Sequence, residues 1–163
     1  MEPNDMPDKM KNIFISHIHE DDPGLGKLKN LLKDNGMTIR DYSISSDNPN
    51  NAHSEEYIKS EILGPRIQQS SALVVYVSPE TKDSEYVNWE IEYAQKCEKR
   101  IVGVWADGEA GCELPDALKN LADAVVGWTG NRIIDAINGK IDGWENPDGT
   151  PSTPRDIKRY SCA

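Results

Sequence analysis

The sequence is poor in cysteine, in positive charge and in long apolar runs. Its three cysteines show no CxxC or other metal-ligand spacing, which argues against a disulfide framework and a zinc site. No apolar run approaches the roughly 18 residues of a membrane span, and residues 1–11 are polar, unlike a signal peptide. Because 28 acidic residues face 18 basic ones, the formal net charge is −10. We therefore expect a cytoplasmic protein that binds neither nucleic acid nor membrane, although a local pocket can still accept a nucleotide.

Two phosphate-binding motifs are also missing. No GxGxxG follows the first predicted strand and no GxxxxGKS/T occurs, which excludes a Rossmann fingerprint and a P-loop.

A response receiver needs a phosphorylatable aspartate at the end of its third strand, but the third predicted strand here ends in Val77-Ser78-Pro79. A receiver-like regulator is therefore the weakest alternative, with Asp41 as a poor phosphate acceptor.

Strand and helix patterns alternate along most of the chain. Short apolar runs typical of strands occur at residues 12–16, 37–42, 73–77, 100–105 and 124–127, and segments with helical spacing of apolar residues separate them. A chain of 163 residues fits one domain. Right-handed crossovers between parallel strands then predict an α/β fold, a flavodoxin-like, doubly wound five-stranded parallel sheet of order 2-1-3-4-5.

The ends of the chain lack this periodicity. We expect residues 1–11 to form a flexible leader, residues 12–139 the domain, and residues 140–163 a tail packed on the domain or extending from it. Within the domain, Gly64-Pro65 should break or kink a helix. The residues expected to cap helices are Asp22, Ser54, Asp83 or Ser84, and Thr129.

The central apolar run and the helix after it contain the most informative carboxylate. Residues 73–77 are continuously apolar, as in a strand covered on both faces. In the next helix Val87, Ile91 and Ala94 recur at helical spacing and should pack on the sheet. Glu90 lies beside this face, near the carboxyl ends of the strands where such sheets bind ligands. The residues that share its stripe are Tyr86, Tyr93 and Cys97. Glutamate is a good helix former, and most helix glutamates are solvated residues without a catalytic role, which is the alternative for Glu90.

Two segments together resemble Toll/interleukin receptor (TIR) domains. Ile13-Phe14-Ile15-Ser16-His17, followed by Glu20-Asp21, is similar to the first TIR box, in which a strand ends in F-I-S ahead of acidic residues. Tyr86-Val87-Asn88-Trp89-Glu90-Ile91 resembles the W-V-x-x-E-I/L element of the NAD-consuming members, with tyrosine in place of their tryptophan. The resemblance spans residues 12–138 and is strongest to the short TIR-like proteins of bacterial Thoeris anti-phage systems, the ThsB-like branch.

This resemblance implies an activity. The NAD-consuming members cleave the nicotinamide–ribose bond of NAD+, and their helix glutamate, Glu90 here, is essential. NAD+ is then the substrate, and neither a cofactor nor a metal is implied. We expect an NAD+ glycohydrolase or cyclase that makes an ADP-ribose-derived signal, a cyclic ADP-ribose isomer, in anti-phage defence. Its expected partners are a phage-derived trigger and a downstream effector that reads the nucleotide signal.

Further candidate residues lie at the end of the first strand and beside Glu90. Ser16, His17 and His19 can hold ribose or phosphate oxygens, although a purely structural role is nearly as plausible on sequence grounds. The His-x-His spacing lacks a third metal ligand, so no metal site is expected. Tyr86 and Trp89 can stack on a base or on nicotinamide, and Trp89 can instead pack in the core.

The loop after the second strand carries the last two candidates. Ser45 and Ser46 correspond in position to the BB loop, which in TIR assemblies contacts a neighbouring protomer and helps close the site. The resemblance therefore implies self-assembly through this loop, while an ordinary surface loop is the equal alternative. The rival function is a non-enzymatic TIR-like scaffold that recruits partners, in which Glu90 would be a surface residue.

Overall fold

The fold was described from a computed structural model, which places residues 10–18, 21–41, 58–106, 113–147 and 149–152. The strands are β1 (Met10–Ser16), β2 (Thr38–Asp41), β3 (Ala72–Val77), β4 (Arg100–Trp105), β5 (Ala124–Val126), β6 (Trp144–Glu145) and β7 (Pro151–Ser152). The helices are α1 (Asp22–Asp34), the π-helix η4 (Ile58–Leu63), α3 (Gly64–Gln69), the 3-10 helix η5 (Thr81–Asp83), α4 (Glu85–Lys96), α5 (Asp116–Leu121) and α6 (Gly130–Ile137).

The strands form one sheet of order β2-β1-β3-β4-β5-β6-β7, parallel except for the last pair. The predicted order 2-1-3-4-5 is therefore confirmed. The sheet does not end at β5, however, because β6 and β7 come from the segment expected to be a tail. Each of these strands has only two residues, too few to show a period in the sequence.

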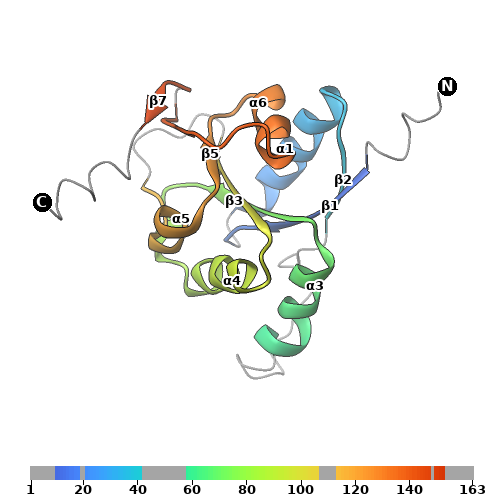
Figure 1. Ribbon diagram of the computed structural model, residues 1–163, viewed down its shortest axis with the longest axis vertical. Coiled ribbons are helices and arrows are strands. Elements are labelled where there is room, and N and C mark those ends of the chain that lie inside the picture. The colour runs from blue at the N-terminus through green and yellow to red at the C-terminus, as the bar shows by residue number, and fades with distance from the viewer. Residues whose placement is uncertain (1–9, 19–20, 42–57, 107–112, 148, 153–163) are drawn as a thin grey trace, which may run out of the picture.

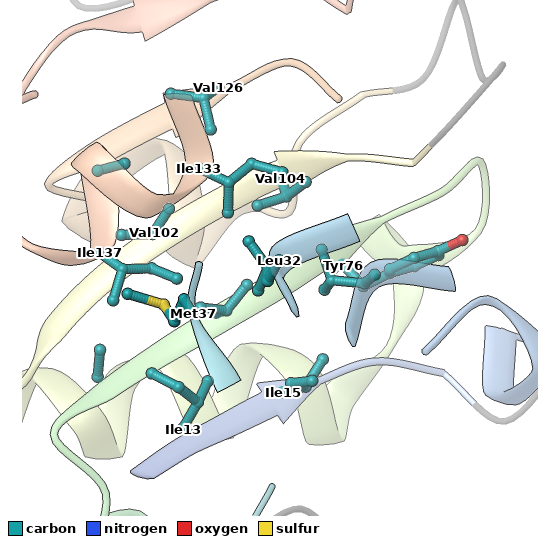
Figure 2. Close-up of a cluster of buried hydrophobic side chains, with 14 of the residues drawn as sticks. Ile13, Ile15, Leu32, Met37, Tyr76, Val102, Val104, Val126, Ile133 and Ile137 are labelled. Atoms are coloured by element: carbon teal, nitrogen blue, oxygen red, sulfur yellow. The ribbon is translucent and has the colours of Figure 1, made fainter. Parts of the chain in front are cut away.

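Helices cover both faces of the sheet, with α1 and α6 on one side and α3, α4 and α5 on the other (Figure 1). All six residues of β3 are buried, as its continuous apolar run predicts. Figure 2 shows the core on the α1 and α6 side, where Leu32 and Ile133 meet side chains from four strands. Full burial of one such aliphatic side chain contributes about 1.5–3 kcal/mol.

The boundaries of the first strand and helix differ from those expected. Strand β1 begins at Met10 rather than at residue 12. The residue before α1 is Asp21, not Asp22, and its side chain makes no capping hydrogen bond to this helix. Its Oδ2 instead accepts a 2.6 Å hydrogen bond from the Ser78 hydroxyl after β3. Gly36, with φ of 102°, follows the end of α1 as predicted.

The expected interruption at Gly64-Pro65 is present as a change of helix type. Wide π-helical turns end at Leu63, and a regular α-helix begins at Gly64 with Pro65 in its first turn. Proline has no N–H to donate to the preceding turn, so it fits the start of a helix. Ser54, the predicted cap of this segment, lies outside the described residues. In the described part of the chain, no helix is long and apolar enough to cross a membrane.

Candidate functional site

Glu90 is buried on the flank of α4. The helix starts at Ser84, whose Oγ accepts a 3.1 Å hydrogen bond from the Val87 N–H. From this start, Val87 and Ile91 face the sheet and are fully buried. Glu90 lies beside them with only 7% of its surface exposed. A solvated helix glutamate, the alternative reading of this residue, does not describe that environment.

A hydrogen bond joins Glu90 to the end of the first strand. Ser16 is the last residue of β1, is fully buried, and points to the same face of the sheet as Phe14. Its Oγ donates a 2.5 Å hydrogen bond to Glu90 Oε1. The two segments that resemble TIR boxes, 74 positions apart in the chain, therefore meet at the carboxyl edge of the sheet.

The environment of Glu90 favours its neutral form. Burial raises the pKa of Glu90 from 4.5 to about 8, and the hydrogen bond from Ser16 opposes this effect because it stabilises the carboxylate. The free protein therefore holds Glu90 mostly protonated at neutral pH. Strongly raised carboxyl pKa values are concentrated at functional sites, although buried structural groups show them as well.

Three aromatic residues of α4, Tyr86, Trp89 and Tyr93, lie within four positions of Glu90 in the sequence. Trp89 and Tyr93 stack with their centroids 5.0 Å apart and their planes 14° apart. The Lys59 ammonium, from η4, lies 5.4 Å from the Tyr86 ring centroid and 5.7 Å from that of Trp89. Gln68 in α3 donates a 2.6 Å hydrogen bond to the Tyr93 hydroxyl. The side of α4 that bears Glu90 is thus an aromatic surface with one lysine over it.

The other predicted site residues are only partly described. His17 is half-buried, and its Nδ1 donates a 2.9 Å hydrogen bond to the Ile15 carbonyl, which fixes the ring next to Ser16. His19, Ser45 and Ser46 lie outside the described residues, so their roles stay predictions. Among the described side chains, no group of three His, Cys, Asp or Glu residues could hold a metal ion.

Polar contacts fix the loops around this edge. After β3, the Thr81 hydroxyl accepts a 2.9 Å hydrogen bond from the Ser78 N–H and donates to the Tyr76 carbonyl at 3.2 Å. With the bond from Ser78 to Asp21, this network ties the loop before α4 to the start of α1. Asn88, on α4, accepts a 3.0 Å hydrogen bond from the Ala117 N–H and so anchors α5.

Two open hollows of about 450 and 470 Å³ lie elsewhere on the described surface. The first is between the end of α4 and α5 and includes Lys99 and Asn120. The second is lined by residues of η4 and α3, among them Ile62 and Arg66. Neither hollow contains Ser16, Glu90 or the three aromatic rings. The candidate site is therefore identified by the Ser16–Glu90 hydrogen bond and by the burial of the Glu90 carboxyl, and neither hollow is part of it.

The sequence indicated some of these residues and missed others. Glu90, Ser16, Tyr86 and Trp89 follow from the two motifs. No sequence motif indicates Lys59. It lies in a π-helix, so the α-helical period does not predict which side of the helix it occupies.

Comparisons with known proteins give one family match and several structural likenesses. A family model described as "Thoeris protein ThsB, TIR-like domain" matches residues 14–110, more than half of the chain. A conserved protein from Enterococcus faecalis V583 is 14% identical, with 92% of this chain and 96% of that chain covered and a TM-score of 0.47. The CMP N-glycosidase BcmB of Clostridium botulinum is 17% identical over 71% and 84% of the two chains, with a TM-score of 0.44.

The TIR domains of the Roq1 resistosome, which recognises the effector XopQ, are 24% identical, with 58% of this chain and 57% of that chain covered and a TM-score of 0.39. These structural likenesses are too distant to bear on activity. The search of curated proteins gave no significant match.

Proposed function

This chain belongs to the TIR-like domain family of Thoeris ThsB proteins, and from that premise we propose that it cleaves the nicotinamide–ribose bond of NAD+, with Glu90 as the catalytic residue. The observation that supports this proposal most directly is the buried Ser16–Glu90 hydrogen bond at the carboxyl edge of the sheet. A carboxyl held there beside aromatic rings can act on a cationic sugar.

The bond that breaks is between the anomeric carbon and the pyridinium nitrogen. Its electron pair leaves with nicotinamide, which becomes neutral, so the leaving group needs no proton. Positive charge then develops on the ribose, and the Glu90 carboxylate stabilises that oxocarbenium-like state electrostatically. One carboxylate suffices for this chemistry, in contrast to the paired carboxylates of ordinary glycosidases.

Binding of substrate and ionisation of Glu90 are coupled in this mechanism. Burial raises the pKa of Glu90 to about 8, which favours the neutral carboxyl in the free protein at neutral pH. A pyridinium cation placed next to it favours the charged form, so binding of NAD+ releases a proton. Ser16 contributes by donating its hydrogen bond to the carboxylate.

The product depends on what attacks the anomeric carbon. Water gives ADP-ribose, whereas a group of the same nucleotide gives a cyclic ADP-ribose isomer and loses its proton to solvent. Aromatic rings that shield the anomeric carbon from water would favour the intramolecular attack. We propose the cyclic product as the signal, with a downstream effector that reads it, a phage-derived trigger, and self-assembly through the loop that contains Ser45 and Ser46.

Chromatography of NAD+ reactions tests the proposal. Wild-type protein, alone and from phage-infected cells, is incubated with NAD+, and nicotinamide, ADP-ribose and cyclic products are resolved. We expect nicotinamide release from the triggered sample and a loss of at least about 100-fold in Glu90→Gln, since the amide cannot carry the charge. Exposed Glu92→Gln, in the same helix, is the matched control and should keep full activity.

Two results would count against the proposal. Full turnover by Glu90→Gln would remove this residue from the mechanism. No release of nicotinamide from triggered wild-type protein would leave the non-enzymatic scaffold as the better account.

A further inference from the structure

Lys59 is the cation nearest to the aromatic surface that the structure describes beside Glu90. It projects from η4, is half-buried, and its ammonium lies over both the Tyr86 and the Trp89 rings. The faces of aromatic rings carry partial negative charge, so they attract an ammonium or a pyridinium in the same way. The Lys59 ammonium therefore lies over the ring faces on which a pyridinium ring could stack.

Tyr93 makes this position more restrictive. Because Tyr93 already stacks on one face of Trp89, a planar ligand can stack only on the other face. Tyr93 is itself held by the hydrogen bond from Gln68. A residue of α3 thus helps to fix the Trp89–Tyr93 stack. The Lys59 side chain, with its flexible four-carbon stem, can move more easily than this stack.

The charge of the chain gives the lysine a second task. A dinucleotide brings two negative phosphates towards a protein whose formal net charge is −10. A local cation offsets that repulsion, and a charge-assisted hydrogen bond to phosphate is stronger than the contact of an ammonium with a partly exposed ring. A diphosphate close to this position would therefore offer the ammonium a stronger contact than the rings do.

From these contacts we infer that Lys59 is a positioning residue that moves on binding: its ammonium leaves the Tyr86 and Trp89 rings for the diphosphate of the dinucleotide, and the pyridinium takes the vacated ring face. This inference rests on the proposed function and names the part of the substrate that each group recognises. One side-chain movement delivers positive charge to the phosphates and opens the aromatic surface. The π-helical turn suits such a role, since π-turns occur frequently at functional sites.

Two probes that carry one half of the substrate each separate the two tasks. ADP-ribose has the diphosphate without the pyridinium, and 1-methylnicotinamide has the pyridinium without phosphate. Their affinities for the full chain are measured by calorimetry in wild type, Lys59→Met and Lys59→Arg. Lys119→Met is the matched control, because it removes the same charge from an exposed position on α5.

We expect Lys59→Met to weaken ADP-ribose binding about tenfold and to leave 1-methylnicotinamide binding unchanged or stronger. Lys59→Arg should restore most of the ADP-ribose affinity, and Lys119→Met should bind both probes like wild type. Unchanged ADP-ribose binding in Lys59→Met would overturn the inference. Equal weakening of both probes would also overturn it, because it would show that Lys59 only holds the rings in place.

These outcomes are distinguishable from failure of the proposed function. ADP-ribose binding does not require cleavage, and cleavage is followed separately through nicotinamide. Cleavage by wild type together with unchanged ADP-ribose binding in Lys59→Met would refute only the role of Lys59. Absence of ADP-ribose binding in the wild type would refute that role as well, whatever the cleavage assay gives.

Discussion

At the scale of single residues, the contact between Ser16 and Glu90 decides the chemistry available to this protein. A glutamate with 7% of its surface exposed costs free energy to ionise, and the serine hydroxyl is the partner that reduces this cost. Ser16 therefore adjusts the pH range in which Glu90 carries charge. In the proposed mechanism this effect is exerted through Glu90, while the direct contact of Ser16 with ribose or phosphate oxygens stays a prediction.

Replacement of Ser16 by alanine should move the acidic limb of the pH profile. The hydrogen bond stabilises the charged form, so its loss raises the pKa of Glu90 further above the value of about 8 that it has in the wild type. Because the proposed reaction needs the carboxylate, kcat/KM should then rise only at higher pH than in the wild type. Steady-state NAD+ cleavage between pH 6 and 10 measures this displacement.

Ser71→Ala provides the comparison for that experiment. Its exposed hydroxyl donates to the Asn12 carbonyl, far from any carboxyl described at the site, so its pH profile should match that of wild type. A Ser16→Ala profile that coincides with the wild-type profile, at any level of activity, would mean that this hydrogen bond does not govern the ionisation of Glu90.

The sequence predicted these residues better than it predicted their contacts. Ser16 and Glu90 were identified from a strand end and from a helix stripe, but nothing in either segment specifies a bond across 74 positions. Lys59 was not identified, since its place over the rings depends on η4 being π-helical. Positions with a regular period can be read from sequence, whereas partners brought together by packing cannot.

At the scale of elements, the start of α4 sets where Glu90 lies. The Ser84 hydroxyl accepts from the Val87 N–H and so fixes the first turn of this helix. Thr129 precedes α6 in the same N-cap position, yet its side chain makes no capping hydrogen bond. The sequence predicted both residues as caps, and only the structure shows which one forms the bond.

This difference predicts unequal effects of two similar substitutions. Ser84→Ala should lower the free energy of unfolding by about 1 kcal/mol, because it leaves an N–H of the first turn without its acceptor. Thr129→Ala should lower it by less than about 0.5 kcal/mol, as is usual at exposed sites without such a contact. Urea titrations followed by circular dichroism measure both values. Equal losses in the two variants would refute the assignment of the capping bond.

At the scale of the whole molecule, the sheet is completed by residues that the sequence pattern assigned to a tail. Trp144 in β6 has 9% of its surface exposed and packs on the α4 and α5 side of the core. The next residue, Glu145, is also buried, and its carboxylate accepts from the Gly127 N–H at 2.9 Å and from Arg132. Its carbonyl accepts a 2.7 Å hydrogen bond from the Trp105 indole.

These contacts explain why five strands were predicted, whereas the described residues form a sheet of seven. The first five strands are recognisable because each is a run of apolar residues between helices of regular period. Strands β6 and β7 are held mainly by a buried aromatic ring and a buried carboxylate, and neither leaves a periodic signal in two residues. Part of the segment expected to pack on the domain or to extend from it therefore adds strands to the sheet.

Trp144→Ala tests whether this segment is part of the cooperative unit. Removal of a buried indole leaves a cavity and should lower the free energy of unfolding by about 3 kcal/mol, with a single transition retained. Lys140→Ala, at an exposed position of the same segment, should change it by less than about 0.5 kcal/mol. Thermal and urea unfolding of both variants give the comparison. If Trp144→Ala unfolded at the wild-type midpoint, the segment would only lie against a sheet that is stable without it. Strand β6 would then contribute nothing to the stability of the domain that holds Ser16 and Glu90 in place.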